Sequence, residues 1–307
     1  MESGILRQRA ELLNRLRQFF VELGFLEVET PLAAREAIPE RTIALAGTTD
    51  GRFLQASPEM HHKRLLCAGA GQIFEVTKSF RGEELGALHN SEFTLVEWYR
   101  PGDCLRDGMT LVEQLLEDVT GATSAKRTTY RDAFSRALAV DPHTATDDEL
   151  RRLAVSLGVA SELGDRDDSL NELLALAVEP LLGRDGPEFL YHYPASQAAL
   201  AATVVDEHGT HVAERFELYW QGIELANGYH ELTDATELRR RLEAANDQRA
   251  AAGWPRVPMP EALLADMADP GLPPCTGVAL GFDRLVMLAI GAKSISDVRL
   301  FCEGESA

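Results

Sequence analysis

The chain has 307 residues, with 45% hydrophobic and 7% aromatic content, which is typical of a globular protein with a sizeable core. Its formal charge of -19 argues against a broad nucleic-acid-binding surface, because such surfaces draw their affinity mainly from Lys and Arg. No apolar stretch reaches the length of a membrane span and the N-terminus lacks a signal-peptide pattern, so we expect a cytoplasmic protein.

Residues 5–23 carry apolar side chains at helical spacing, and Gly24 is placed as the C-terminal stop of this predicted helix. The segment that follows, GFLEVETP, alternates like a strand and ends at Pro31. Taken alone, the pair is typical of an ordinary helix and strand packed on a core.

Residues 39–53 are predicted to be a loop, and a strand, a Ser-Pro-Glu turn and a helix follow. Ser57 can cap that helix and Pro58 suits its first position. Glu59 complements the helix dipole in the simplest interpretation. The run HHKR at 61–64 is predicted to be a helix face rather than a metal site, because adjacent helical residues point in different directions.

Cysteines are few and far apart along the chain: Cys67, Cys104, Cys275 and Cys302. None of them forms a C-x-x-C pair, so their spacing indicates neither a zinc ribbon nor a disulfide framework. We expect reduced thiols.

The central segment runs from Gln72 to Arg100 and is predicted to be a strand, a charged loop and a second strand. A solvated surface connection is the simple alternative, since loops are polar by default. The chemical interpretation needs a second site elsewhere in the chain. Ionisable and planar side chains gather in and after the loop: Arg81, Glu83, Glu84, His89, Asn90 and Phe93.

Residues 101–187 are predicted to form a mostly helical insertion between the central strands. Acidic residues between Asp165 and Asp168 fit no EF-hand spacing, so we expect a solvated loop there. The predicted helices lie near residues 105–119, 130–138, 147–157 and 168–181.

Strands resume in FLYHYPASQAAL, and residues 214–219 and 223–229 are predicted to pair as an antiparallel hairpin around residues 220–221. In that register Glu217 and Glu224 face each other, and a divalent cation would convert their repulsion into binding. A turn shifted by one residue would remove this pairing, and two exposed strand glutamates are the alternative.

Residues 277–291 are predicted to be a strand running into an apolar helix with Arg284 in its first turn. A cation at a helix start is poorly matched to the macrodipole, so this position indicates an anionic ligand. Arg81 and Arg284 together suit a polyphosphate, because each guanidinium offers a planar fork to phosphate oxygens.

Two of these segments resemble motifs of the class II aminoacyl-tRNA synthetases. F-R-x-E at 80–83 is similar to motif 2, and G-x-x-x-G-x-D-R at 277–284 is similar to motif 3. Residues 5–31 are similar to motif 1, which forms the dimer interface in that family. The similarity covers about Leu6 to Leu300 and is greatest to the lysyl-tRNA synthetase core. It implies an α+β fold, an antiparallel sheet flanked by helices, in one catalytic domain over 1–307, and a homodimer.

The resemblance also implies a nucleotide site. Arg81 and Arg284 are the expected catalytic residues: Arg81 would hold the α-phosphate of ATP, and Arg284 would sandwich the adenine with Phe93. Glu217 and Glu224 are the expected ligands of Mg2+. The expected ATP-binding residues are Arg81, Glu83, His89, Asn90, Phe93, Glu224, Leu225, Gly281 and Arg284.

A site for a lysine-like substrate is implied in the same way. Glu231 would pair with the side-chain ammonium, since a charged amine in a closed pocket must be paired. Ala279 stands where lysyl-tRNA synthetases carry glycine, and its methyl group should affect which lysine isomer fits. The expected substrate-binding residues are Ser57, Pro58, Glu59, Tyr99, Asn227, Glu231 and Ala279.

Within the family, segments such as SPEMHHKRLL and GIELANGYHELTD are most similar to the stand-alone ligases that act on elongation factor P. The resemblance implies an ATP-dependent ligase that activates (R)-β-lysine or lysine as an adenylate and transfers it to a lysine side chain of that factor. No anticodon-binding domain is expected, so charging of tRNA is not expected either. The alternatives are a truncated lysyl-tRNA synthetase and a non-catalytic amino-acid- or nucleotide-binding regulator. Gly82 departs from the Asn common in these ligases. An acidic acceptor would need a local basic patch, for which Arg35, Arg41, Arg52 and the helix at 239–249 are candidates. For each of them taken singly, a solvated face is the preferred interpretation.

Overall fold

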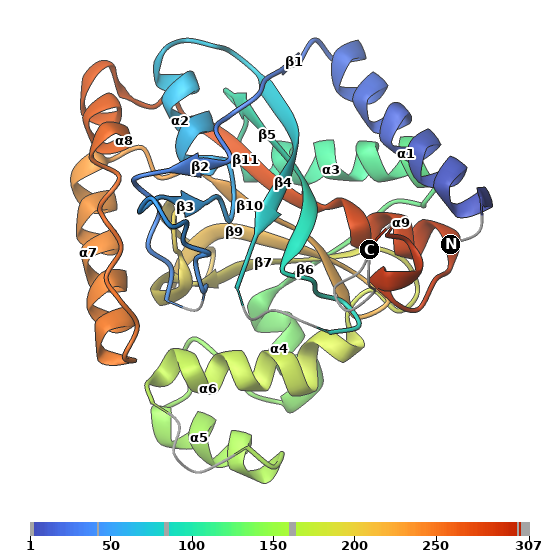
Figure 1. The fold of residues 1–307 in the computed structure, drawn as a ribbon. Coiled ribbons are helices and arrows are strands. Elements are labelled where there is room, and N and C mark those ends of the chain that lie inside the picture. The colour runs from blue at the N-terminus through green and yellow to red at the C-terminus, as the bar shows by residue number, and fades with distance from the viewer. Residues whose placement is uncertain (1–2, 42, 83–85, 160–163, 300, 302–307) are drawn as a thin grey trace. The chain divides into compact units, whose positions relative to one another are not determined.

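The computed structural model describes residues 3–41, 43–82, 86–159, 164–299 and 301. The chain divides into two compact units. The first unit comprises Met1–Cys104, Asp118–Thr120 and Leu232–Ala307, and the second comprises Leu105–Glu117 and Gly121–Glu231. Figure 1 labels most of the helices and strands of both units.

The first unit contains strands that pair in the order β1, β4, β5 and β11. β5 pairs antiparallel with β4 and with β11, whereas the short strand β1 pairs parallel with β4. The α+β class is confirmed, and the antiparallel prediction is right for the long strands and wrong for β1. A separate short antiparallel pair joins β2 and β3. The bounds are β1 (Leu26–Glu27), β2 (Ala33–Ala34), β3 (Phe53–Leu54), β4 (Ile73–Phe80), β5 (Glu92–Pro101) and β11 (Cys275–Gly281).

Helix α1 is held to this unit by its apolar side. Leu16 and Phe20 are fully buried, and the Phe20 ring stacks on Phe74 with 4.7 Å between ring centroids. Burial of such apolar area is the main term that stabilises an amphipathic helix. Gly24 follows with a φ of +79°, in the left-handed region where a helix ends most easily.

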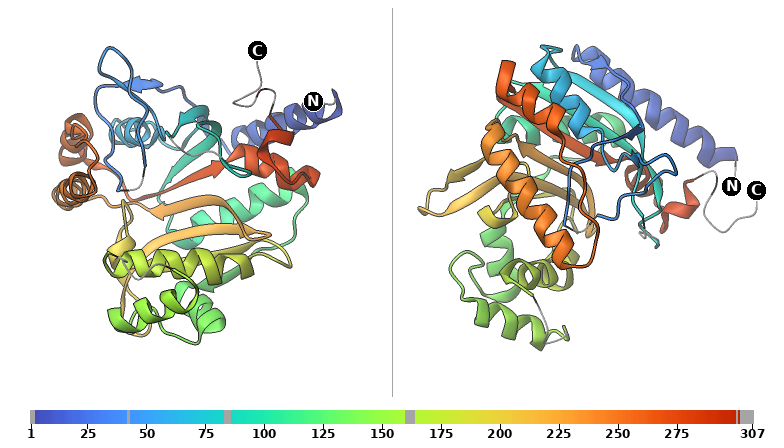
Figure 2. Two further views of the ribbon diagram at one scale, coloured as in Figure 1. Left: turned by 60° about the horizontal axis from the view of Figure 1, so that its bottom comes forward. Right: turned by 60° about the vertical axis from the view of Figure 1, so that its left-hand side comes forward.

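The other helices of the first unit surround the same strands. α2 contacts β5 and α8, and Figure 2 shows α7 and α8 as neighbouring helices. None of the helices in the described ranges has the length and hydropathy that a membrane span requires. The bounds are α1 (Ser3–Glu22), α2 (Glu59–Cys67), α7 (Ala235–Ala251), α8 (Glu261–Asp266), η4 (Met267–Gly271), α9 (Phe282–Ile290) and η5 (Ile295–Asp297).

The second unit pairs its strands in the order β10, β9, β7 and β6, with β8 also on β9. β6 and β7 are parallel and the other pairs are antiparallel. The sequence analysis missed β6, because four residues carry too little periodicity to indicate a strand. The bounds are β6 (Lys126–Thr129), β7 (Glu188–Pro194), β8 (Thr203–Val205), β9 (His211–Trp220) and β10 (Ile223–His230).

The predicted helical segments of the second unit are confirmed. The Tyr130 ring packs on Phe134 and Tyr193, with centroid distances of 4.5 and 4.8 Å, at the centre of the core. The acidic turn at Asp165 and Asp168 is a capping box that starts α6 rather than a plain solvated loop. The bounds are α3 (Leu105–Thr120), whose last residues belong to the first unit, α4 (Tyr130–Leu138), α5 (Asp147–Ser156), α6 (Arg166–Leu173), η1 (Leu174–Val178), η2 (Glu179–Leu181) and η3 (Ala195–Gln197).

The hairpin of β9 and β10 turns one residue later than predicted. Gln221 and Gly222 form the turn with φ values of +56° and +74°. Glu217 therefore pairs with Asn227 rather than with Glu224, and a bulge follows Glu224. The predicted direct pairing of the two glutamates is wrong, because the turn geometry sets the register.

Candidate active site

Arg81 follows the last residue of β4 and lies over an aromatic ring of β5. Its guanidinium carbon is 5.2 Å from the centroid of the Phe93 ring, a cation–π distance. Its backbone N–H donates to the Ser91 carbonyl at 2.9 Å, which continues the β4/β5 ladder. Among the described residues, its buried Nε has no hydrogen-bond partner. A fixed guanidinium with an open donor suits an anionic ligand. Glu83, the predicted adenine ligand, lies outside the described residues.

Arg284 lies in the first turn of α9 and turns toward the loop that precedes β5. Its Nη2 is 2.7 Å from Nε2 of His89, and its Nε donates to the Leu88 carbonyl at 3.3 Å. The same loop is anchored where the Ile295 N–H donates to the Ala87 carbonyl at 3.0 Å. The structure thus brings together Arg284 and His89, two residues that the sequence analysis assigned to the nucleotide.

Two further residues predicted to bind the nucleotide, Asn90 and Gly281, lie where secondary-structure elements begin. Asn90 donates from its side chain to the Glu92 carbonyl at 2.8 Å, which shapes the entry to β5. Gly281 is the N-cap of α9, where a side chain is absent.

Asp283 anchors the start of α9, a role that the sequence analysis missed. It is 4% exposed, accepts a hydrogen bond from the Thr94 backbone N–H at 2.9 Å, and forms an ion pair with Arg9 at 2.7 Å. Since Asp283 directly precedes Arg284, these contacts fix the turn that presents Arg284.

Three residues lie in line across β4, β5 and β11. Glu75, Glu97 and Ala279 are direct partners in the strand register, so their side chains lie on the same face. Helix α2 covers this face through its contacts with β5. Ala279, predicted to line the substrate pocket, therefore lies beside two buried carboxylates.

Glu97 is the centre of this polar site and was missed in the sequence. It is 2% exposed and accepts hydrogen bonds from the Tyr99 hydroxyl at 2.8 Å and from the Ser57 hydroxyl at 2.7 Å. The structure thus joins Ser57 and Tyr99, two predicted substrate residues, through Glu97, which was not predicted. Tyr99 stands two residues after Glu97 on one strand face, and this E-x-Y spacing was the available signal.

Pro58 and Glu59 begin helix α2. Pro58 is the N-cap, one residue before its predicted position, and the Glu59 backbone N–H donates to the Ser57 hydroxyl at 3.0 Å. The Glu59 carboxylate pairs with Lys63, one turn later, at 2.5 Å. Burial raises the pKa of Glu59, and Lys63 opposes this rise. Glu59 and Lys63 therefore form a partly buried ion pair.

His62 is fully buried between Glu75 and Glu97. Its Nε2 is 2.9 Å from Oε2 of Glu75, and its Nδ1 is 3.6 Å from Oε1 of Glu97. Burial alone would lower the pKa of His62, but the two carboxylates outweigh it and the pKa is raised. Burial alone would raise the pKa of Glu75, but hydrogen bonds from His62 and Thr30 lower it. The predicted helix face at 61–64 is thus divided, with His62 and Lys63 buried.

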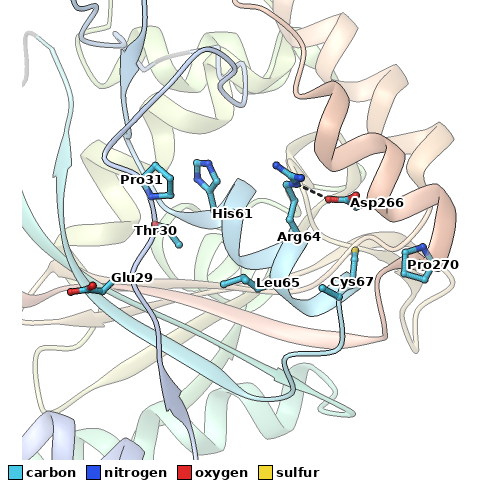
Figure 3. Close-up of a pocket in the computed structure, with 10 residues that line it drawn as sticks. Glu29, Thr30, Pro31, His61, Arg64, Leu65, Cys67, Asp266 and Pro270 are labelled. Atoms are coloured by element: carbon cyan, nitrogen blue, oxygen red, sulfur yellow. Dashed lines mark hydrogen bonds and ion pairs between the residues drawn. The ribbon is translucent and has the colours of Figure 1, made fainter.

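A cavity of about 410 Å3 is lined in part by α2 (Figure 3). His61, Arg64 and Leu65 line it from α2, and Arg64 pairs with Asp266 at 2.6 Å. Thr30 lines it from the chain after β1 and donates twice to Glu75, from its N–H at 3.1 Å and from its hydroxyl at 2.9 Å. Glu75 therefore connects the wall of this cavity to the cluster around Glu97.

In the second unit, Glu217 is buried and fully engaged. The Tyr193 and Tyr219 hydroxyls donate to its Oε2 at 2.6 and 2.5 Å, and Arg215 and Asn227 donate to its Oε1 at 2.5 and 3.3 Å. Four donors use the roughly four lone-pair positions of a carboxylate. A metal ion would have to displace one of them, so the arrangement described fits Mg2+ poorly at Glu217.

The remaining predicted residues of the second unit lie on or next to β10. Glu224 lies opposite Tyr219 and therefore on the same strand face as Glu217, and Leu225 is buried beside it. Asn227 is opposite Glu217, and Glu231 is 2% exposed directly after the strand. Within the described residues no group of three or more His, Cys, Asp and Glu side chains has a metal-site arrangement.

The arginines of α7 that were considered as a basic patch for the acceptor are buried or paired with carboxylates. Arg249 is 2% exposed and donates to the backbone carbonyls of Glu40 and Ile43 at 2.6 and 2.8 Å. Arg239 pairs with Glu261 at 2.5 Å, and Arg240 and Arg241 each pair with Glu237 at 2.8 Å. Their charges serve internal contacts and paired surface positions.

Comparison with known proteins agrees with the motifs. Residues 2–305 match the family described as tRNA synthetases class II (D, K and N). The chain is 46% identical over 308 residues to proteins named elongation factor P–(R)-β-lysine ligase from Salmonella paratyphi A, Salmonella choleraesuis and Salmonella heidelberg. Each match covers 96% of this chain and 94% of the relative.

Proposed function

We propose, since the chain belongs to the class II tRNA synthetase family (D, K and N), that it is an ATP-dependent ligase acting on elongation factor P. It activates (R)-β-lysine or lysine as an aminoacyl-adenylate and transfers the aminoacyl group to a lysine side chain of the factor. The names of its relatives support elongation factor P as the acceptor and (R)-β-lysine as the amino acid. A cytoplasmic location belongs to the same proposal, because the acceptor is a translation factor.

The observation that carries the proposal is the buried carboxylate of Glu97. Its hydroxyl partners Ser57 and Tyr99 orient it, and Ala279 lies directly opposite on β11. Glu59 is already neutralised by Lys63, whereas Glu75 and Glu97 share one histidine. One negative charge is left over, and an ammonium group of a lysine-like substrate would balance it.

In the first step the substrate carboxylate attacks the α-phosphorus of ATP, and pyrophosphate leaves. Arg81 binds the α-phosphate and stabilises the charge that develops there, and Phe93 and Arg284 hold the adenine ring. In the second step an acceptor amine attacks the carbonyl carbon of the adenylate, AMP leaves, and the amine loses a proton. Positioning and charge suffice for both steps, so no covalent intermediate with the enzyme is needed.

Magnesium is proposed as the metal that accompanies ATP, where it would neutralise phosphate charge. Glu224 is the candidate protein ligand with the clearer access. Glu217 would join it only after losing one of its four hydrogen bonds. Asn227 and Glu231 are proposed to bind the amino-acid substrate, with Glu231 on the side-chain ammonium.

A homodimer through residues 5–31 is also proposed. Apolar side chains are exposed on and after α1, and such residues favour contact with another protein surface. The side chains are Val21, Leu23 and Leu26, with exposed fractions of 59, 42 and 57%.

The test is ATP-dependent transfer of labelled lysine and of labelled (R)-β-lysine to purified elongation factor P, with bulk tRNA in a parallel reaction. We expect label on the protein alone, with one isomer preferred. Label on the RNA would instead identify a minimal synthetase. Pyrophosphate exchange without transfer to either acceptor would retain the activation step and reject elongation factor P, and no exchange at all would favour a non-catalytic regulator.

A further inference from the structure

The buried carboxylates of Glu75 and Glu97 present an electrostatic problem. They are direct partners on neighbouring strands, with exposed fractions of 4 and 2%. Two like charges this close and this dry do not stay ionised together without a cation, and one of them takes up a proton instead. The cation that lies between them is His62.

The hydrogen bonds of Glu75 indicate the charge state of His62. Glu75 accepts from the Thr30 N–H at Oε1 and from the Thr30 hydroxyl at Oε2, so both of its oxygens act as acceptors and the donor role falls to His62 Nε2, which lies 2.9 Å from Oε2. With Nε2 donating, a neutral imidazole would turn the lone pair of Nδ1 toward Glu97, which is repulsive. A protonated ring presents N–H groups to both carboxylates.

His62 acts on Glu97 through charge rather than through a hydrogen bond. The 3.6 Å between Nδ1 and Oε1 exceeds hydrogen-bond length, and hydroxyl groups already occupy both oxygens of Glu97. The imidazole ring is also fixed in place, with its edge against Tyr99 at a centroid distance of 5.4 Å.

We infer that His62 is a positioning residue for the amino-acid substrate: it neutralises Glu75, so that Glu97 stays ionised and available to one substrate ammonium group. This inference rests on the proposed function, because it assigns the ammonium to Glu97. Under this inference Glu75, His62 and Glu97 act as one electrostatic cluster, and the histidine is needed only because Glu75 is present.

Replacing His62 alone, and then His62 together with Glu75, separates this positioning role from simple packing. His62→Gln keeps a donor near the Nε2 position but loses the charge, so one carboxylate becomes protonated. We expect the KM for the lysine-type substrate in pyrophosphate exchange to rise about tenfold at pH 7, from the loss of a charged hydrogen bond. The KM for ATP should stay unchanged. His62→Gln combined with Glu75→Gln removes the competing carboxylate, so its amino-acid KM should return to within about threefold of the wild-type value.

An unchanged amino-acid KM in H62Q would overturn the inference, and so would a double variant as impaired as H62Q. If H62Q alone does not fold, the double variant is compared directly with the wild type, and a KM raised tenfold there counts against the inference. A raised KM for ATP in H62Q would indicate a general structural role and would also reject it.

The charge of His62 can also be measured without enzymatic activity, so the inference stays testable if the proposed function fails. The groups that face His62 are Glu75 from β4, Glu97 and Tyr99 from β5, and Glu59, His61 and Lys63 from α2. The carboxylates dominate, so NMR of labelled histidine should find His62 protonated at pH values above its ordinary pKa of about 6.5. Glu75→Gln should lower that titration midpoint. A neutral His62 at pH 7 would reject the inference even in a protein without ligase activity.

Discussion

Single residues in this protein take their chemistry from their neighbours. Glu97 is one of many strand residues in the sequence, yet its contacts with Ser57, Tyr99 and His62 make it a buried, oriented carboxylate. Arg81 is one of many arginines. Its ring contact, and an Nε without a hydrogen-bond partner among the residues that the structure describes, distinguish it from Arg240, which is paired on the surface of α7.

Arg81→Ala should reduce amino-acid-dependent pyrophosphate exchange by about 10^2 to 10^3, the usual cost of losing one donor to a developing charge. Arg81→Lys should recover only part of this loss, because an ammonium lacks the planar fork. Arg240→Ala is the matched control and should retain full activity. Exchange at the wild-type rate in Arg81→Ala would remove Arg81 from the catalytic step.

At the scale of elements, the β9/β10 hairpin depends on close packing of a ring on a glycine. Gly228 is the direct partner of Phe216, and a β-carbon added at Gly228 would lie 2.3 Å from Cζ of that ring. Phe216 is fully buried and packs edge-on against Phe189 at 5.5 Å, so it has little room to move. Glycine is therefore required here for space rather than for a special φ.

Gly228→Ala should lower the free energy of unfolding by about 1–3 kcal/mol, the usual cost of overpacking a core. Gly4→Ala is the control: an added β-carbon there has no neighbour within 4 Å, and alanine favours a helix by up to about 1 kcal/mol. Urea denaturation of both variants checks this, and equal midpoints would show that Phe216 yields freely.

The elements also mark how far sequence patterns reach. The amphipathic period of α1, the Gly24 stop and the strand-to-helix change at Gly281 were all predicted correctly, because each is a local signal. β6 was missed, and the strand predicted before Pro31 is limited to the two residues of β1. Pairing partners define both short strands, and local patterns do not contain those partners.

The candidate site was predictable in the same uneven way. Arg81, Arg284 and Ser57 stand in recognisable segments, and their contacts are with Phe93, His89 and Glu97, while their roles toward ligands stay predictions. Glu97, His62 and Asp283 were missed because their roles arise from contacts between distant segments. The register of Glu217 was wrong because one residue in the turn and one bulge decide it.

At the scale of the whole molecule, the proposed dimer depends on exposed apolar side chains near α1. Leu26→Glu should place a charge in the interface and convert a dimer to a monomer in light-scattering measurements at micromolar concentration. Leu176→Glu is the control, since Leu176 is 51% exposed and lies far along the chain from residues 5–31. A monomeric wild-type protein, or an unaffected dimer in Leu26→Glu, would reject this interface.

The contact between Arg9 and Asp283 ties the N-terminal helix to the residue that precedes Arg284. Arg9 also donates to Thr94 at 3.2 Å and lies over the Phe282 ring at 4.9 Å, so one side chain clamps α1, β5 and α9 together. If α1 is detached, for example by a protease cut before β1 or by a bulky fusion partner, Asp283 loses its Arg9 contact. The helix turn that carries Arg284 should then be less well fixed. Changes at the N-terminus should therefore also reach Arg284, the residue proposed to hold the adenine ring.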